Sequence, residues 1–148
     1  MRVHKWPGDS GYTKLFTGEE VSKDVLRVET YGVIDELNSF IGLARTRIED
    51  REVNVILKDI HKHLFTMGAD LAKSQSKGKR ALITIDDVQF LHDNVKRIEA
   101  ELKPIDKFVV PGGSPASALL HVCRSVARRA ETRIVFLKKQ EIVNEEIP

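Results

Sequence analysis

Apolar residues recur at alternating steps of three and four positions along most of this chain, a spacing that places them on one face of an α-helix. The first such series is Ile34, Leu37, Ile41, Ala44 and Ile48. A second series covers residues 53–71, a third covers 85–102, and a fourth helix is expected from 115 to about 139. Four long helices without a convincing series of strands predict an all-α, up-and-down helix bundle.

Local signals mark the ends of the third and fourth helices. Thr84 and Asp87 have the spacing of a capping box, and Pro104 follows the third helix. Ser114 is a favourable N-cap, with Pro115 at the first helical position. The expected buried side of the fourth helix is Leu119, Val122, Val126, Ala130 and Leu137.

The remaining segments are polar. Proline, glycine and charged residues throughout residues 1–27 predict an irregular N-terminal arm. Residues 74–80 form a polar loop that we expect to be mobile, and residues 141–148 hold no further periodic segment. With 148 residues and no repeat, the chain is expected to be a single domain spanning 1–148.

Composition excludes several classes of protein. The net charge of only +2 argues against non-specific nucleic-acid binding, and no apolar run approaches the roughly 18 residues that a membrane span needs. The single Cys123 cannot form an internal disulfide, so a reducing compartment and a cytoplasmic location are expected, with Cys123 as a small core residue. His61 and His63 would face different directions on a helix, and no set of metal-ligating side chains is predicted.

A basic face is expected on the fourth helix. Its members are His121, Arg124, Arg128 and Glu131, flanked by Arg129 and Arg133. Arginine suits bidentate pairing with phosphate or carboxylate, which favours a binding surface, although a solvated helix face would give the same pattern.

The first helix carries the complementary feature. Asp35, Asn38 and Gly42 share one stripe beside its apolar residues. If Asp35 is buried it needs a cationic partner, from this chain or from another subunit. Gly32 and Gly42 each weaken a helix by roughly 1 kcal/mol relative to alanine, which indicates either the close approach of a ligand or a tight helix crossing.

The N-terminal arm combines glycines with hydroxyl and amine groups, at Gly8, Gly11, Thr13, Lys14 and Lys23. Glycine lets backbone N–H groups approach a phosphate, and lysine adds a point charge. Taken alone, the segment could equally be an ordinary loop.

In chain order, these segments resemble the PduO-type ATP:cob(I)alamin adenosyltransferases. The matching motifs are Gly8-Asp9-x-Gly11-x-Thr13, Tyr31-Gly32-x-x-Asp35-Glu36-Leu37-Asn38-Ser39, Phe108-Val109-Val110-Pro111-Gly112-Gly113-Ser114 and Arg124-x-x-x-Arg128-Arg129-Ala130-Glu131. The resemblance implies a five-helix bundle, homotrimers with active sites between subunits, and transfer of the 5′-deoxyadenosyl group of ATP, with Mg²⁺, to the cobalt of reduced cobalamin. A reductase that supplies Co(I) and a cobalamin-dependent client enzyme are the further partners it implies.

The resemblance also assigns residues. Its nucleotide-binding positions are Lys5, Trp6, Pro7, Gly8, Thr13, Lys14, Lys23, Arg128, Arg129, Glu131 and Thr132. It pairs Asp35 with Arg124 in an intersubunit salt bridge and places Phe108 against the lower face of cobalamin. The residues expected to carry catalysis are Arg128, Asp35 and Phe108.

Two departures from the family pattern matter. Lys5-Trp6-Pro7 replaces a segment that often carries two threonines, and the family's last helix, which bears a nucleotide-contacting asparagine, is expected to be missing from this sequence. They leave open a nucleotide- or corrinoid-binding sensor or delivery module without turnover. A purely structural bundle would leave the arginine face and the arm without a role.

Overall fold

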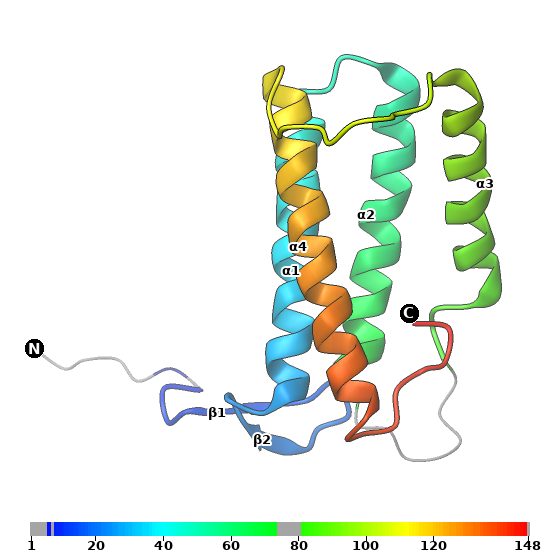
Figure 1. The fold of residues 1–148 in the computed structure, drawn as a ribbon. Coiled ribbons are helices and arrows are strands. Elements are labelled where there is room, and N and C mark those ends of the chain that lie inside the picture. The colour runs from blue at the N-terminus through cyan, green and yellow to red at the C-terminus, as the bar shows by residue number, and fades with distance from the viewer. Residues whose placement is uncertain (1–5, 7, 74–80, 148) are drawn as a thin grey trace, which may run out of the picture.

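The computed structural model describes residues 6, 8–73 and 81–147, and it is a bundle of four helices preceded by a short hairpin (Figure 1). The elements are β1 (Tyr12–Lys14), β2 (Glu20–Ser22), α1 (Leu26–Arg45), α2 (Arg51–Leu71), α3 (Ile85–Glu101) and α4 (Pro115–Lys138). Successive helices run in opposite directions, which confirms the predicted all-α, up-and-down bundle. The predicted loop 74–80 lies outside the described residues.

Helix α1 is central and packs against both α2 and α4. Its buried apolar residues are Ile34, Leu37, Ile41 and Ala44, as their spacing predicts. They meet Leu64 and Leu71 of α2 and the buried face of α4, which consists of Cys123, Val126, Ala130, Ile134 and Leu137. Helix α3 has no buried residue and lies at the edge of the bundle (Figure 1).

The capping signals fulfil their predicted roles. The Asp87 carboxylate accepts the backbone N–H of Thr84 at 2.8 Å at the start of α3. The Ser114 hydroxyl accepts the backbone N–H of Ser117 at 3.1 Å, and Pro115 opens α4. These contacts satisfy N–H groups that have no partner within a helix.

Three details of the sequence prediction were wrong or incomplete. The arm is not wholly irregular, because β1 and β2 pair antiparallel with Thr13 opposite Val21. Helix α1 begins at Leu26, one turn or more before its apolar series. Val122 is 38% exposed and does not belong to the buried side of α4, whereas Leu119 is half-buried against the core.

The segment after α4 turns back upward at the lower end of the bundle, toward the start of α3 (Figure 1). Val143 and Ile147 are buried there, so residues without helical periodicity still contribute to the core. Within the described residues, no helix is long and apolar enough to cross a membrane.

Candidate functional site

A hollow of about 680 Å³ opens on the hairpin at the start of the bundle. Its lining residues are Gly8, Ser10, Tyr12, Thr13, Lys14, Glu20 and Lys23. Two lysines and a threonine from the predicted nucleotide-binding set therefore face one cavity. Their amines and hydroxyl can contact an anionic group from several sides.

Lys23 lies directly against the backbone of Gly8. A Cβ added at Gly8 would stand 3.1 Å from Lys23 Nζ, so a side chain there would push the ammonium group slightly away. Gly8 also has a φ of +96°, a conformation that side chains rarely adopt. The arrangement brings a bare segment of backbone and an ammonium group together, as phosphate binding requires.

A tight turn precedes this hollow. The Trp6 N–H donates to the Asp9 carboxylate at 2.8 Å, and the Asp9 N–H donates to the Trp6 carbonyl at 3.1 Å. The Trp6 side chain is 67% exposed. Lys5 and Pro7 were also predicted to contact nucleotide, but they lie outside the described residues.

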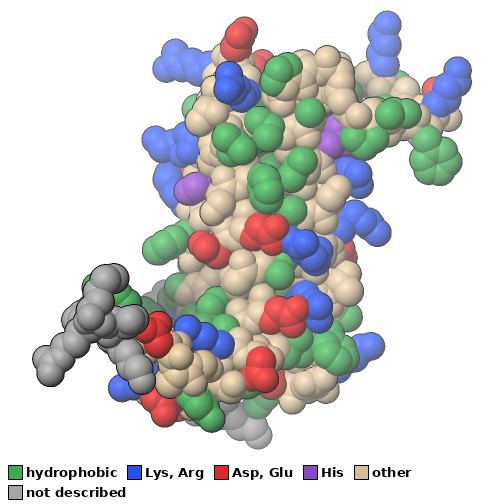
Figure 2. Space-filling model, turned by 90° about the vertical axis from the view of Figure 1, so that its left-hand side faces the viewer, with side chains coloured by type: hydrophobic (Ala, Val, Ile, Leu, Met, Phe, Trp, Pro, Cys, Tyr) green, Lys and Arg blue, Asp and Glu red, His purple; other side chains and the backbone are tan. Residues whose placement is uncertain are grey.

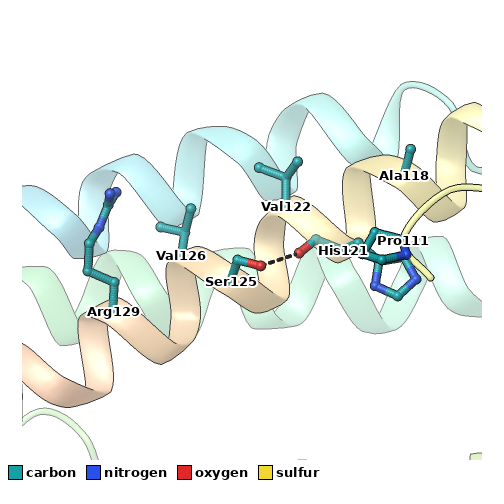
Figure 3. Close-up of a pocket in the computed structure, with 7 residues that line it drawn as sticks. All are labelled: Pro111, Ala118, His121, Val122, Ser125, Val126 and Arg129. Carbon is teal, nitrogen blue, oxygen red and sulfur yellow. Dashed lines mark hydrogen bonds between the residues drawn. The ribbon is translucent and has the colours of Figure 1, made fainter. Parts of the chain in front are cut away.

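A second cavity, of about 340 Å³, lies along the outer side of α4 (Figure 3). It is lined by Pro111, Ala118, His121, Val122, Ser125, Val126 and Arg129. Figure 3 shows the Arg129 side chain at one end of this row and Pro111 and His121 at the other. The exposure of Val122 has its explanation here, because its side chain lines this cavity rather than the core.

The basic face of α4 divides into paired and exposed arginines. Arg129 pairs with Glu36 of α1, and Arg133 pairs with Glu29 of α1 at 2.8 Å. Arg124 and Arg128 are exposed, and neither forms an ion pair with any described residue. Figure 2 shows acidic and basic side chains interspersed over the lower half of this side of the bundle, while hydrophobic side chains gather above.

Asp35 is exposed in this chain, and its carboxylate forms no ion pair within the described part. Of the two partners left open for Asp35, a cation from the same chain is therefore not found in the described part, and the intersubunit pair with Arg124 stays a prediction. Asn38 is buried, with its side-chain oxygen unpartnered among the described residues. Gly42 faces His61 of α2, where an added Cβ would be 3.5 Å from the ring, an ordinary contact distance, so the packing of α1 on α2 does not by itself require glycine here.

Phe108 is fully exposed, with a relative exposure of 105%. It lies in the connection between α3 and α4, where Ile105 and Val110 are also highly exposed. Phe108 is therefore not a core residue of the single chain. This connection crosses the end of the bundle opposite the hairpin, so one chain does not bring Phe108 and the lysine-lined hollow together (Figure 1).

Sequence reasoning missed several residues that line the two cavities. Ser10, Tyr12 and Glu20 line the hollow on the hairpin, and Ser125 lines the cavity on α4. A strand-like alternation around Thr13 could have indicated Tyr12 and Lys14 as neighbours on one face. Ser125 follows His121 by one helical turn and donates to its carbonyl at 3.0 Å.

Cys123 is buried as predicted, and desolvation raises the pKa of its thiol above the ordinary value. A thiol held in its neutral form is a poor nucleophile. Within the described ranges, no group of three or more His, Cys, Asp or Glu side chains is placed to hold a metal ion.

Comparison with known proteins decides the family. The family model described as "Cobalamin adenosyltransferase" matches residues 5–148. The chain belongs to this family. The assignment confirms the family predicted from the motifs and the enzyme class, an ATP:corrinoid adenosyltransferase. It gives no support to a binding module without turnover.

Individual relatives agree. The chain is 40% identical to a corrinoid adenosyltransferase of Bacillus subtilis, an alignment that covers 99% of this chain and 77% of the relative. It is 37% identical to the corrinoid adenosyltransferase PduO of Salmonella typhimurium, over 93% of this chain and 41% of that longer protein. The match therefore extends over almost the whole of this chain.

Solved structures share the fold. A PduO-type ATP:corrinoid adenosyltransferase from Lactobacillus reuteri, in a phenylalanine-to-alanine variant complexed with cobalamin and ATP, is 29% identical, with a TM-score of 0.86 over 94% of this chain and 79% of that chain. An arginine-to-lysine variant of an enzyme from the same organism, complexed with ATP, is 29% identical, with a TM-score of 0.83 over 97% of this chain and 82% of that chain.

Proposed function

We propose that this adenosyltransferase moves the 5′-deoxyadenosyl group of ATP to the cobalt of a reduced corrinoid at sites formed between the subunits of a homotrimer. Cobalt(I) attacks the ribose C5′ atom, a Co–C bond forms, the C5′–O bond breaks, and triphosphate leaves with the bonding electrons. Because cobalt(I) is itself a strong nucleophile, the protein has to position C5′, stabilise the leaving triphosphate and exclude water.

The observation that carries this proposal is the lysine-lined hollow on the hairpin. Lys14 and Lys23 supply positive charge to it, Thr13 supplies a hydroxyl, and Gly8 supplies accessible backbone. Charge-assisted hydrogen bonds of this kind are stronger than those between neutral groups. We therefore assign the phosphates of ATP to this hollow.

Arg128 is the second proposed phosphate contact. The Lactobacillus reuteri structures carry substitutions of a phenylalanine and an arginine that stand twenty positions apart, the separation between Phe108 and Arg128 here. Arg129 already pairs with Glu36, whereas Arg128 has no ion-pair partner among the described residues. Arg128 therefore keeps its full charge available for phosphate, and Glu131 and Thr132 are proposed neighbours of the nucleotide on the same helix.

Phe108 is proposed to cover the lower face of the corrin. A fully exposed phenylalanine forfeits the free energy that burial would supply, so a bound apolar surface is a natural partner for it. Covering that face excludes water and an axial ligand from the cobalt.

The separation of these groups supports sites shared between subunits, as in the proposed homotrimer. Helix α4 has 24 residues, a length of about 36 Å, and the hairpin and Phe108 lie toward opposite ends of the bundle (Figure 1). A neighbouring copy can bring one end of its bundle to the other end of this one. Asp35 and Arg124 are both exposed and lack ion-pair partners in the described part of the chain, which supports their proposed pairing across the interface.

Mg²⁺ is proposed to arrive with ATP as the counter-ion of its phosphates. The described side chains do not themselves form a metal site, so no step is assigned to a protein-held ion. We place the reaction in the cytoplasm because Cys123 is a free thiol, and we expect a reductase and a corrinoid-dependent enzyme upstream and downstream of it.

The decisive experiment mixes the protein with MgATP and chemically reduced cobalamin without oxygen. We expect the Co(I) absorbance to disappear while adenosylcobalamin and triphosphate form in equal amounts. Lys23→Ala should weaken ATP binding, whereas Lys62→Ala on the outer side of α2 serves as a matched control. Binding of ATP without any product would contradict the proposed transfer.

A further inference from the structure

The hairpin that carries the phosphate hollow is anchored to the bundle at its loop. Leu15, directly after β1, is buried with 7% exposure, although most of its neighbours are exposed. The next backbone N–H, that of Phe16, donates to the carbonyl of Ala72 at 2.8 Å. The position of Lys14 and Thr13 therefore depends on where the segment after α2 holds the Ala72 carbonyl.

One side chain fixes that segment. Arg27, in the first turn of α1, is only 3% exposed. A single terminal nitrogen of its guanidinium, Nη1, donates to the carbonyl of Leu71 at 2.8 Å and to the carbonyl of Lys73 at 3.0 Å. The two carbonyls on either side of Ala72 are thus held by the same group.

The rest of the guanidinium is also engaged. Its Nε donates to the Glu141 carboxylate at 2.7 Å, and Nη2 donates to the carbonyl of Ile142 at 3.1 Å. The segment after α4 therefore supports Arg27 from the other side. The planar guanidinium group has donors in fixed directions and can bond all of these acceptors together, which an ammonium group cannot do.

Arg27 also lies four residues after Lys23, whose side chain approaches Gly8. Lys23 enters the hollow from the turn between β2 and α1, while Lys14 enters it from β1. The same guanidinium thus ties the base of α1 to the residue on which the hairpin rests. The pairing of β1 with β2 and the hydrogen bond from the Lys23 N–H to the Gly11 carbonyl, at 2.8 Å, hold the two lysines on one hairpin, and Arg27 holds that hairpin against the bundle without touching the hollow.

We infer that Arg27 is a positioning residue for the nucleotide: through Leu71, Ala72 and Lys73 it holds the hairpin in the geometry that binds the phosphates of ATP. This inference rests on the proposed function of the hollow. It assigns no contact between Arg27 and either substrate. Its consequence is that ATP affinity depends on a buried arginine outside the site.

The test compares Arg27→Lys with Arg97→Met, a control at an arginine that pairs with Glu52 on the far side of the bundle. For Arg27→Lys we expect the KM for ATP to rise about tenfold, with the KM for the corrinoid and the kcat at saturating ATP changed less than twofold. Hydrogen exchange should accelerate in peptides from residues 12–22 and not in α4. A purely structural role would instead lower kcat, through loss of folded enzyme, and leave the KM for ATP unchanged; that outcome would overturn the inference.

If Arg27→Lys does not fold, Leu15→Ala is a second variant that weakens the attachment of the hairpin to the bundle. It should raise the KM for ATP, and in combination with Arg27→Lys the two effects should be less than additive. An unchanged KM in folded Leu15→Ala would also overturn the inference. ATP binding without corrinoid, followed by the fluorescence of Trp6, the single tryptophan, separates the two proposals. If the wild type binds ATP but forms no product, the proposed transfer fails while the role of Arg27 in binding can still be measured.

Discussion

Phe108→Ala separates a role in chemistry from a role in folding. A buried phenylalanine that is truncated to alanine costs about 3–5 kcal/mol of stability. For a chain of this size that would lower Tm by roughly 6–20 °C. Phe108 has a relative exposure of 105%, so its truncation removes no contact with the core of its own chain. We therefore expect Tm to fall by less than about 2 °C, within the usual range of a surface substitution.

The catalytic effect should be selective. If the ring covers the lower face of the corrin, its loss admits water or an axial ligand to the cobalt and makes Co(II) harder to reduce on the enzyme. Turnover that starts from Co(II) and a reductant should slow by at least about tenfold, which corresponds to about 1.4 kcal/mol. Turnover with chemically prepared Co(I) should slow less, and ATP affinity should stay nearly unchanged.

The assay combines thermal melting with turnover under both reduction regimes. Phe65→Ala is a suitable control, because Phe65 is 74% exposed on α2 and belongs to neither cavity described above. A large fall in the Tm of Phe108→Ala, together with equal losses in the two turnover assays, would refute the reasoning. It would show that Phe108 supports the folded assembly rather than the cobalt.

Three further predictions concern the charged residues. Arg128→Ala should weaken ATP binding or turnover by about 10- to 150-fold, because it loses one charge-assisted contact of about 1.5–3 kcal/mol, while corrinoid binding and the fold persist. Arg128→Lys should restore little of the loss. Wild-type ATP affinity in titration calorimetry together with wild-type turnover, in either variant, would contradict the phosphate contact. The wild type should have the mass of a trimer in light scattering. Asp35→Ala should lower that mass and the activity more than the control Glu99→Ala does. A monomeric wild type would contradict the proposed interface between Asp35 and Arg124. The Thr84 N–H holds the pKa of Asp87 below its ordinary value. Asp87→Ala removes one half of the capping box, and we expect it to cost at most about 1 kcal/mol at neutral pH, because solvent screens this contact. A carboxylate whose pKa is lowered on folding stabilises the fold at pH values above its unfolded-state pKa, and this stabilisation is lost as the pH falls through its folded-state pKa. The Tm values of wild type and Asp87→Ala should therefore converge in acid. A Tm difference that stays constant with pH would be evidence against this cap.

Features that depend on contacts between residues close together in the chain were predicted correctly from the sequence, whereas features that depend on contacts between distant segments were not. Ser114 and Asp87 cap helices through N–H groups three residues away, so the sequence alone located them correctly. The apolar series of α1 likewise predicted the buried side chains Ile34, Leu37, Ile41 and Ala44, because helical spacing fixes a common face. In α2 the series predicted the packed face, of which only Leu64 and Leu71 are buried. Gly8, Thr13 and Lys14, which the sequence groups in one motif, line one hollow for a similar reason, since these residues are close in the chain.

Tertiary contacts decided the features that the sequence left open or predicted wrongly. The strands β1 and β2 have three residues each, too few to be recognised by pattern, and their loop rests on the bundle through Leu15 and the hydrogen bond from Phe16 to Ala72. Val122 has the spacing of a core residue, yet α4 turns it toward the outer cavity.

The sequence by itself determined four helices, the caps of α3 and α4, the family and part of the lining of the hollow on the hairpin, because these depend on short motifs and on spacing within one segment. Only the tertiary structure decided that Asp35 and Phe108 are exposed, and that Arg27 is buried where Leu71, Lys73 and Glu141 meet. A charged side chain near the start of a helix usually faces water. Its burial here depends on acceptors from segments 44 and 114 residues away, and no pattern within the chain predicts which distant groups will meet.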